Sequence, residues 1–247
     1  MLNTLYTSPS APASRLNLLS AWLVHLYTAS GALCAFFGTL AVFADRYRAA
    51  LLWMVAATAI DATDGWLARK ARVKDRLPIV DGARLDDIVD YLTFVFVPAL
   101  FLYRSGALPE GWGAAVASVV LLSSAYGFSA NDAKTSDHFF TGFPSYWNIV
   151  AVYLYIARLP VLWNVLILVG LSALVFWRIG YVYPSRTPMF RGLTLGLATC
   201  WAVLVVMMIL AIPQVPPVLF TASLVFPVYY LVLSYVLHRR RPAPAQP

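Results

Sequence analysis

Four aspartates between residues 61 and 90 have the side chains and the spacing to carry out chemistry. Asp61 and Asp64 are three residues apart and Asp86 and Asp90 are four apart, so each pair would share one face of a helix. Carboxylates gathered in a poorly hydrated place repel one another and are costly to desolvate unless a cation lies among them. Hard divalent ions take oxygen ligands of this kind, and substrate phosphates often complete the shell. The spacing therefore indicates a divalent-cation site.

The elements that position these aspartates are expected to be transmembrane helices. Of the 247 residues, 61% are hydrophobic and 12% are charged, a composition far from that of a soluble domain. Seven of the eleven acidic residues nevertheless fall between residues 61 and 92, with apolar runs on both sides. We predict an all-α integral membrane protein with no sizeable soluble domain.

The apolar runs predict eight transmembrane helices. We expect them at about residues 20–44, 49–68, 83–103, 112–130, 146–157, 161–179, 192–211 and 217–237. The fifth run is short and is expected to be tilted, partly re-entrant or longer than it looks. Residues 1–19 form an N-terminal segment with an expected interfacial amphipathic helix, residues 20–237 a single transmembrane catalytic domain, and residues 238–247 a basic, disordered tail.

The positions of lysine and arginine predict the orientation, because cytoplasmic loops retain positive charge. With eight spans, fourteen of the eighteen basic residues fall on one side, and Arg46, Arg48, Arg104 and Arg158 fall on the other. Both termini and the hairpin that carries the aspartates should therefore face the cytoplasm. The basic residues are spread over short loops, which favours anionic lipid head groups as partners and argues against nucleic acid.

The residues around the aspartates match a known signature. The pattern Asp61-x-x-Asp64-Gly65-x-x-Ala68-Arg69, followed by Gly82-x-x-x-Asp86-x-x-x-Asp90, resembles that of the CDP-alcohol phosphotransferases, integral membrane enzymes that make phospholipids. Twelve residues separate Arg69 from Gly82, a longer spacer than in most of the family. This spacer, the eight spans and the stretch YGFSANDAKTSDHFFTGFPSYWN are similar to the bacterial phosphatidylcholine synthases.

The resemblance implies that CDP-diacylglycerol condenses with choline to give phosphatidylcholine and CMP at a polar cavity on the cytoplasmic side of a bacterial inner membrane. Two divalent cations, Mn²⁺ or Mg²⁺, would be held by Asp61, Asp64, Asp86 and Asp90. Asp90 would take the proton of the choline hydroxyl, with Asp86 as the second catalytic carboxylate. The CDP moiety would be bound by Gly65, Ala68, Arg69 and Gly82. Homodimerisation is common in families of this kind, so a homodimer is also an expectation.

Choline adds a separate requirement, since its quaternary ammonium has no hydrogen-bond donor and binds best to aromatic faces. Candidates near the cytoplasmic ends of the fourth and fifth spans are Tyr126, Tyr146, Trp147 and Tyr153, and Tyr181 and Tyr183 follow the sixth span. Aromatic residues at these depths also serve as interface anchors. Lys134 and Arg186 could contact lipid phosphate or act as ordinary positive-inside anchors, and Asp87 is expected to be a salt-bridge partner.

Other functions remain open at this point. The signature concerns the CDP group and does not define the acceptor alcohol, so the acceptor could be serine, inositol or glycerol phosphate. A reaction of CDP-choline with diacylglycerol is also compatible with the signature. A cation transporter would usually place its carboxylates near the midplane on broken helices, often in two related halves. Here the carboxylates lie towards one face and no second half repeats them. A purely structural protein would give no reason to gather four aspartates.

Overall fold

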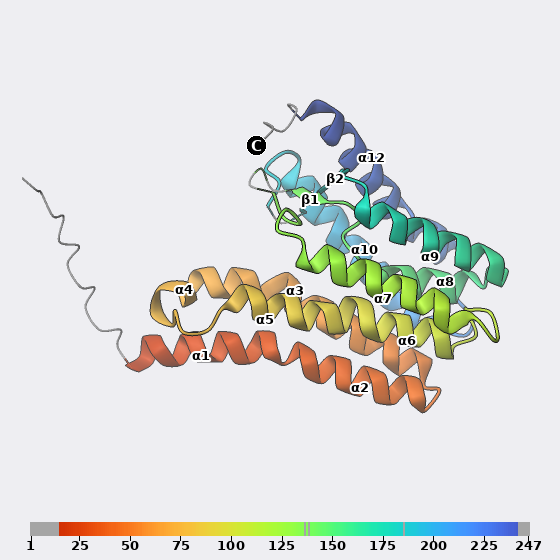
Figure 1. Cartoon of the computed structure of the whole chain (residues 1–247), viewed down its shortest axis with the longest axis horizontal. Coiled ribbons are helices and arrows are strands. Elements are labelled where there is room, and N and C mark those ends of the chain that lie inside the picture. Colours follow the sequence, from red (N-terminus) through yellow and green to blue (C-terminus); the bar gives the residue numbers. More distant parts are fainter. Residues whose placement is uncertain (1–14, 136, 138, 185, 242–247) are drawn as a thin grey trace, which may run out of the picture.

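The computed structural model describes residues 15–135, 137, 139–184 and 186–241. Within these residues the chain is mostly helical, and its helices run side by side as long rods (Figure 1). The prediction of a helical protein is confirmed in this coarser form, and two short strands are an addition.

The amino-terminal half contains four rods. The first consists of α1 (Arg15–Ala29) and α2 (Gly31–Phe43), and the second is α3 (Tyr47–Lys70), which is followed by the single-turn α4 (Val73–Arg76). The third rod joins α5 (Gly82–Asp90), the π-helix η1 (Tyr91–Phe96) and α6 (Val97–Arg104), and the fourth is α7 (Gly113–Ser129).

The carboxyl-terminal half adds four further rods and a small ribbon. The rods are α8 (Trp147–Ala157), α9 (Val161–Phe176), α10 (Arg191–Ala211) and the pair α11 (Pro217–Ser223) and α12 (Val225–Arg240). Strands β1 (Phe139–Thr141) and β2 (Gly180–Val182) pair antiparallel, with Phe140 opposite Tyr181.

The rods of the described residues coincide with the eight predicted runs to within a few residues. Three of them, 15–43, 191–211 and 217–240, are long and apolar enough to cross a membrane, and α7, α8 and α9 are shorter apolar helices. These helices fit a multi-pass membrane protein. As expected, the fifth rod is short: α8 has 11 residues, whereas about 20 are needed to cross a bilayer core of roughly 30 Å. The helix α1 already begins at Arg15, while residues 1–14 and the end of the tail lie outside the described part.

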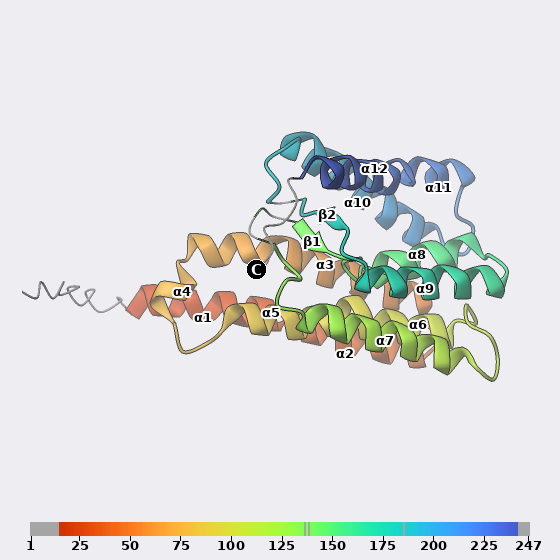
Figure 2. The same cartoon turned by 45° about the horizontal axis from the view of Figure 1, so that its top comes forward.

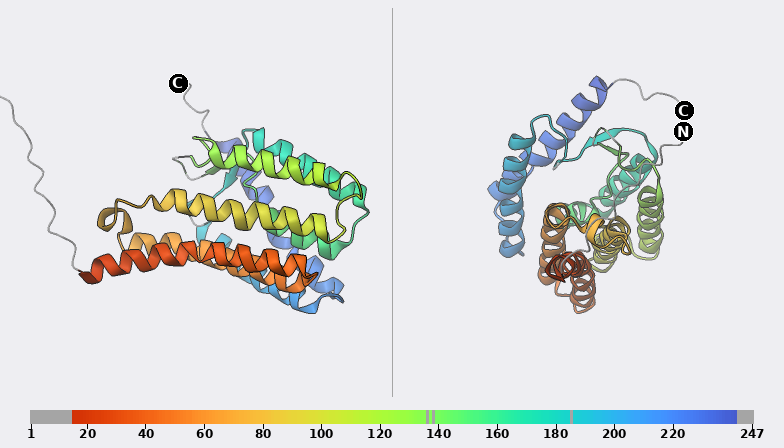
Figure 3. Two further views of the ribbon diagram at one scale, coloured as in Figure 1. Left: turned by 60° about the horizontal axis from the view of Figure 1, so that its bottom comes forward. Right: turned by 90° about the vertical axis from the view of Figure 1, so that its left-hand side faces the viewer.

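The rods form layers. In Figure 2 the helices α10, α11 and α12 lie on one side of α3, α8 and α9, while α1, α2, α5, α6 and α7 lie on the other. The end-on view in Figure 3 shows the α10 to α12 layer beside the rest of the bundle. The turn with α4, the β1–β2 ribbon and the end of α12 all lie towards the same end of the rods (Figures 1 and 2).

Local sequence explains the shape of the third rod. Asp81 caps α5, and its Oδ1 accepts hydrogen bonds from the backbone N–H groups of Ala83 at 3.1 Å and Arg84 at 3.2 Å. Pro98 lies in the first turn of α6, directly after η1. Proline lacks an N–H and its ring would clash with the carbonyl four residues earlier in an ideal α-helix, which the wider π turn relieves. The sequence predicts one continuous helix over residues 83–103, whereas the structure contains the π-helix η1 at Tyr91–Phe96.

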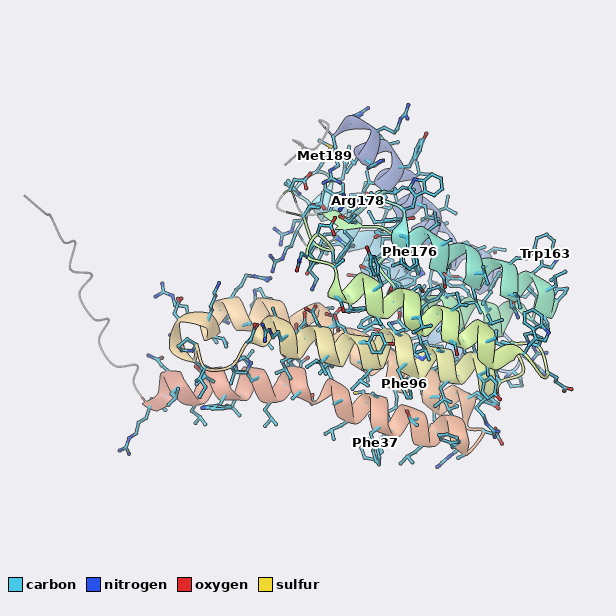
Figure 4. The ribbon with its side chains drawn as sticks, viewed as in Figure 1. Phe37, Phe96, Trp163, Phe176, Arg178 and Met189 are labelled. Carbon is cyan, nitrogen blue, oxygen red and sulfur yellow. The ribbon has the colours of Figure 1, made fainter. Side chains whose placement is uncertain are left out.

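The core is apolar, and so is much of the surface. Leu51, Phe101, Trp147 and Met208 are fully buried in the central cluster between the rods. Large apolar side chains also project outward, among them the labelled Phe37, Phe96, Trp163 and Phe176 (Figure 4). Helices that are apolar both inside and outside are typical of membrane spans.

Candidate active site

The last turns of α3 bring the first two aspartates to the centre of a polar site. Asp64 is buried, with 6% of its surface exposed, and its carboxyl group lies beside the Thr28 hydroxyl of α1 and the Asp86 carboxylate. Asp61 lies one turn earlier on the same face. The sequence predicted that Asp61 and Asp64 would share a face, and α3 places them so.

The helix α5 contributes Asp86 and Asp90, one turn apart. One carboxylate oxygen each from Asp61, Asp86 and Asp90 lie within 4.8 Å of one another. Asp64 lies beside Asp86, next to this group of three. The two helices therefore bring all four predicted aspartates together.

This donor set fits a divalent metal. The oxygens are all carboxylate oxygens, which hard ions such as Mg²⁺ and Mn²⁺ prefer, and they are close enough to share one ion. Without a cation, four negative groups at this spacing would repel one another. The cluster can therefore bind a metal, with room for additional oxygen ligands from a substrate.

A lysine from the loop after α7 lies beside the cluster. The Nζ of Lys134 donates a hydrogen bond to Oδ1 of Asp87 at 3.1 Å and lies 4.0 Å from Oδ2 of Asp86. Burial lowers the pKa of Lys134, but the hydrogen-bonded Asp87 carboxylate and Asp86 outweigh it, so the pKa is raised above its ordinary value. Asp87 is a salt-bridge partner, as expected from its position one step off the Asp86 face.

A cavity of about 270 Å³ opens beside the carboxylates. It is lined by side chains of α3, α5, η1 and the end of α7, by described residues of the loop 130–146, and by Tyr183. The lining residues are Asp61, Asp86, Asp87, Asp90, Phe94, Gly127, Phe128, Ala130, Asn131, Ala133, Lys134, Phe140, Thr141, Phe143, Pro144, Ser145, Tyr146 and Tyr183. We call the described residues of 130–146 the cap.

Aromatic rings line the same cavity as the carboxylates. The rings of Phe140 and Tyr183 have centroids 4.5 Å apart, Phe140 and Tyr146 are 6.3 Å apart, and Phe94 and Tyr146 are 6.4 Å apart. Of the aromatic candidates named from sequence, Tyr146 and Tyr183 line this cavity. Phe94 and Phe140 were missed, although the FF pair in the cap sequence was a visible signal for Phe140.

The other aromatic candidates lie elsewhere. Tyr126 is 58% exposed and packs against Phe176 on the outer surface. Trp147 is fully buried, and its Nε1 donates a hydrogen bond to the Ser124 hydroxyl at 2.6 Å. The hydroxyl of Tyr153 donates to the Ser223 carbonyl at 3.0 Å, in the packing between α8 and α11. Packing, and not the cavity, accounts for these three side chains.

The residues predicted to bind the CDP moiety lie around the same hairpin, outside the cavity lining. Arg69 lies over Gly65, where an added Cβ would come within 3.3 Å of its guanidinium nitrogen. Ala68 packs against the small cluster of α1 and α4 that includes Val24 and Val73. A Cβ at Gly82 would come within 3.2 Å of the His25 ring.

Arg186 contacts the ring of Tyr183, which lines the cavity. Its guanidinium is 5.5 Å from the centroid of the Tyr183 ring.

A second crevice, of about 450 Å³, lies at the other end of the rods and is lined by residues such as Tyr155, Arg158 and Phe220, with no acidic side chain in its lining. The carboxylate cavity is therefore the candidate active site.

The family of the chain follows from comparison with known proteins. The sequence model of the CDP-alcohol phosphatidyltransferase family matches residues 22–177, and the chain belongs to this family of enzymes. The matched part includes both aspartate helices and the whole cap. The resemblance found in the signature is confirmed, and families of this type generally use divalent metals.

Curated relatives narrow the comparison. The chain is 39% identical over 215 residues to a phosphatidylcholine synthase of Pseudomonas aeruginosa, covering 85% of this chain and 90% of the relative. It is 44% identical over 182 residues to a phosphatidylcholine synthase of Legionella pneumophila, covering 72% and 71%. A phosphatidylcholine synthase of Rhizobium meliloti is 33% identical over 219 residues, covering 89% and 91%.

Proposed function

We propose that the protein is a phosphatidylcholine synthase that condenses CDP-diacylglycerol with choline to give phosphatidylcholine and CMP. The observation that carries this proposal is a single cavity lined both by Asp61, Asp86 and Asp90 and by a group of aromatic rings. The carboxylates fit the metal-dependent half of the reaction, and the rings fit the quaternary ammonium of the acceptor. The likeness to several phosphatidylcholine synthases over most of the chain supports the same substrates.

The four aspartates would hold two divalent cations, Mn²⁺ or Mg²⁺. Such ions, when bound, neutralise the pyrophosphate and the CMP that leaves. Asp61 and Asp64 would provide ligands from α3, and Asp86 and Asp90 would provide them from α5. The Thr28 hydroxyl, which lies beside the Asp64 carboxyl group, would help to orient it in the site.

Phosphoryl transfer depends mainly on alignment of the reacting groups and on neutralisation of charge. The choline hydroxyl oxygen would form a bond to the phosphorus that carries diacylglycerol, while the bond from this phosphorus to the CMP oxygen breaks and CMP leaves with the electron pair. Asp90 would accept the hydroxyl proton. Lys134, held beside Asp86 by Asp87, would meet the phosphate oxygens as a fixed positive charge.

Choline would lie against Phe140, Tyr146 and Tyr183. Their faces offer cation–π attraction to a quaternary ammonium, worth about 2 kcal/mol where the site is desolvated. This places the acceptor between the aromatic rings and the carboxylates, with its hydroxyl directed towards Asp90. The CDP moiety would contact the hairpin at Gly65, Ala68, Arg69 and Gly82, as the family signature implies, and Arg186 would meet lipid phosphate at the rim.

The proposed arrangement in the membrane follows the charge distribution. The eight rods would lie in the membrane, with α8 as a short fifth span, and both termini, α4, the cap and the cavity would lie on the cytoplasmic side of the bacterial inner membrane. The lipid substrate would enter sideways from the bilayer and choline from the water. Assembly as a homodimer belongs to the same proposal.

The alternatives fit the cavity less well. Inositol phosphate or glycerol phosphate would need several cations around the acceptor, and among the described residues that line the cavity Lys134 is the one basic side chain. Serine would bring a carboxylate next to the aspartates. The reaction of CDP-choline with diacylglycerol uses the same groups and needs a direct test. A transporter is disfavoured because the carboxylates lie towards one end of the rods.

The experiment is an acceptor assay on detergent-purified protein. CDP-diacylglycerol and Mn²⁺ are supplied with choline, serine, inositol or glycerol 3-phosphate separately, and CMP release and the lipid product are followed. We expect choline alone to give CMP and phosphatidylcholine, and EDTA to stop the reaction. CMP release with another alcohol would refute the choline assignment and leave the metal site intact. If CDP-choline and diacylglycerol give turnover and CDP-diacylglycerol and choline do not, then CDP-choline is the donor and diacylglycerol is the acceptor.

A further inference from the structure

Arg241, directly after α12, forms an ion pair with the cap. Nε and Nη2 of Arg241 each donate a hydrogen bond to Asp137, at 2.7 Å to Oδ2 and 2.7 Å to Oδ1. Nη2 also lies 3.3 Å from the Thr135 hydroxyl oxygen, and the guanidinium lies 4.4 Å from the centroid of the Phe139 ring. Paired hydrogen bonds of this kind fix the direction of both side chains as well as their distance.

The turn that Arg241 contacts lies between Lys134 and Phe140, two cap residues that line the cavity. Lys134 precedes Thr135, and Phe140 follows Phe139, and Lys134 and Phe140 form a β-bridge with each other. The turn is closed by a hydrogen bond from the Thr135 N–H to the Phe139 carbonyl at 2.9 Å. A shift of this turn would therefore move Lys134 away from Asp87 and Phe140 away from Tyr183.

The second strand of the ribbon is held by the same helix. The backbone N–H of Gly180 donates to Nδ1 of His238 at 3.1 Å, the N–H of Val182 donates to the Ser234 hydroxyl at 3.1 Å, and the Tyr230 hydroxyl donates to the Val182 carbonyl at 3.0 Å. The ribbon and the end of α12 lie together in Figures 1 and 2. The helix thus supports both strands, with Arg241 as its contact to the cap turn.

Two glycines leave the space that this arrangement needs. A Cβ at Gly180 would collide with the guanidinium of Arg241. Gly142, at the end of the cap strand, has φ +77° and would collide with the Val175 carbonyl if it carried a Cβ. The ion pair of Arg178 with Asp132 ties the start of the cap to the end of α9, where Figure 4 labels Arg178.

We propose that Arg241 is a positioning residue that, through Asp137, sets the cap over the cavity so that Lys134 and Phe140 meet the substrates. The inference rests on the proposed function and names the part of the chain that completes its acceptor site. Arg241 itself is not among the residues that line the cavity, so its effect on the reaction passes through the cap. A partly exposed ion pair contributes little to overall stability, and the expected effect is therefore on substrate binding.

The test compares R241Q, D137N and the double variant with R240Q, an exposed arginine on the same turn as the matched control. We expect R241Q and D137N each to raise the KM for choline by about tenfold, with kcat within about threefold and Tm within about 2 °C of wild type. The double variant should be no worse than either single one, because both remove the same ion pair. G180A, which leaves both charges and displaces the guanidinium, should act in the same direction.

A fall of Tm with an unchanged KM in R241Q would overturn the proposal and leave Arg241 a structural tie. Hydrogen exchange of the cap amides gives a readout that does not need turnover. Faster exchange in R241Q than in R240Q supports the positioning role, and equal exchange overturns it. If wild-type protein shows no choline-dependent CMP release, the proposed function fails, and the exchange measurement still decides whether Arg241 holds the cap.

Discussion

Lys134 donates a hydrogen bond to Asp87 at 3.1 Å across 47 positions of sequence. Asp87 follows Asp86 on α5, so this contact brings a positive charge from the cap to within 4.0 Å of a predicted metal ligand. The site therefore combines two helices that carry carboxylates with a loop that carries a cation. Each prediction below concerns one part of this combination.

Removing the Lys134 charge should weaken the binding of the CDP substrate. In K134M the Asp87 carboxylate loses its partner and the substrate phosphates lose a fixed cation, and hydrogen bonds to charged groups are worth about 1.5–3 kcal/mol. We expect the KM for CDP-diacylglycerol to rise about tenfold or more, measured as CMP release at saturating choline. D87N should have a smaller effect in the same direction, and equal KM values for wild type and K134M would contradict the assigned role.

The carboxylate of Asp86 should be indispensable for turnover. D86N keeps the size of the side chain but removes a charged oxygen ligand from the group formed with Asp61 and Asp90. We expect kcat to fall by more than about 100-fold, since even the loss of a residue that only hydrogen-bonds to a metal ligand costs about 10–100-fold. Size-exclusion profile and Tm should stay close to wild type. The control is D75N at an exposed aspartate of α4, whose activity should be unchanged.

The aromatic rings should set the affinity for choline. F140L and Y183L keep apolar volume but remove a ring face, and each should raise the KM for choline by about 5–30-fold if the cation–π contact is worth about 1–2 kcal/mol. Y126L is the matched control, because Tyr126 is exposed and is not among the residues that line the cavity. Equal KM values for choline in Y183L and Y126L would show that the choline ammonium does not bind against the Tyr183 ring.

Trp147 should affect stability and leave choline binding alone. W147F removes the hydrogen bond from Nε1 to the Ser124 hydroxyl, which should cost about 1 kcal/mol or more because Ser124 is fully buried. We expect a lower Tm in detergent with an unchanged KM for choline. A raised KM with an unchanged Tm would instead return Trp147 to the list of choline contacts.

The ion pair of the cap should have a defined pH dependence. Burial opposes ionisation of Asp137, but hydrogen bonds from Arg241 and Thr135 outweigh it and hold the pKa of Asp137 below its ordinary value. A carboxyl with a lowered pKa stabilises the folded state above its unfolded pKa of about 3.9 and loses this contribution as the pH falls through the folded value.

The Tm difference between wild type and D137N, which is expected to be no more than about 2 °C, should accordingly be constant from about pH 8 to pH 5 and shrink below about pH 4. Thermal unfolding in detergent at a series of pH values measures it. A difference that disappears already near pH 6 would show that another group is responsible.

Much of the fold could be predicted from sequence because the bilayer imposes a length on apolar runs. The eight runs appear as rods, and the short fifth run is the short helix α8. The π turn at Tyr91–Phe96 could not be predicted, although Pro98 marks it in retrospect. In helices that are apolar on all sides, the period does not tell which face meets lipid and which meets the core, and Tyr126 and Trp147 therefore looked alike.

The sequence by itself determined the four aspartates, their pairing on two helices and the family to which the chain belongs. Helical spacing is local, so residues three or four apart must share a face whatever the rest of the fold does. Only the tertiary structure decided which aromatic rings line the same cavity as the carboxylates and that Arg241 pairs with Asp137 of the cap. These contacts join Phe140 to Tyr183 and Asp137 to Arg241 across long stretches of chain. Such contacts arise from the packing of whole elements, which no local spacing encodes.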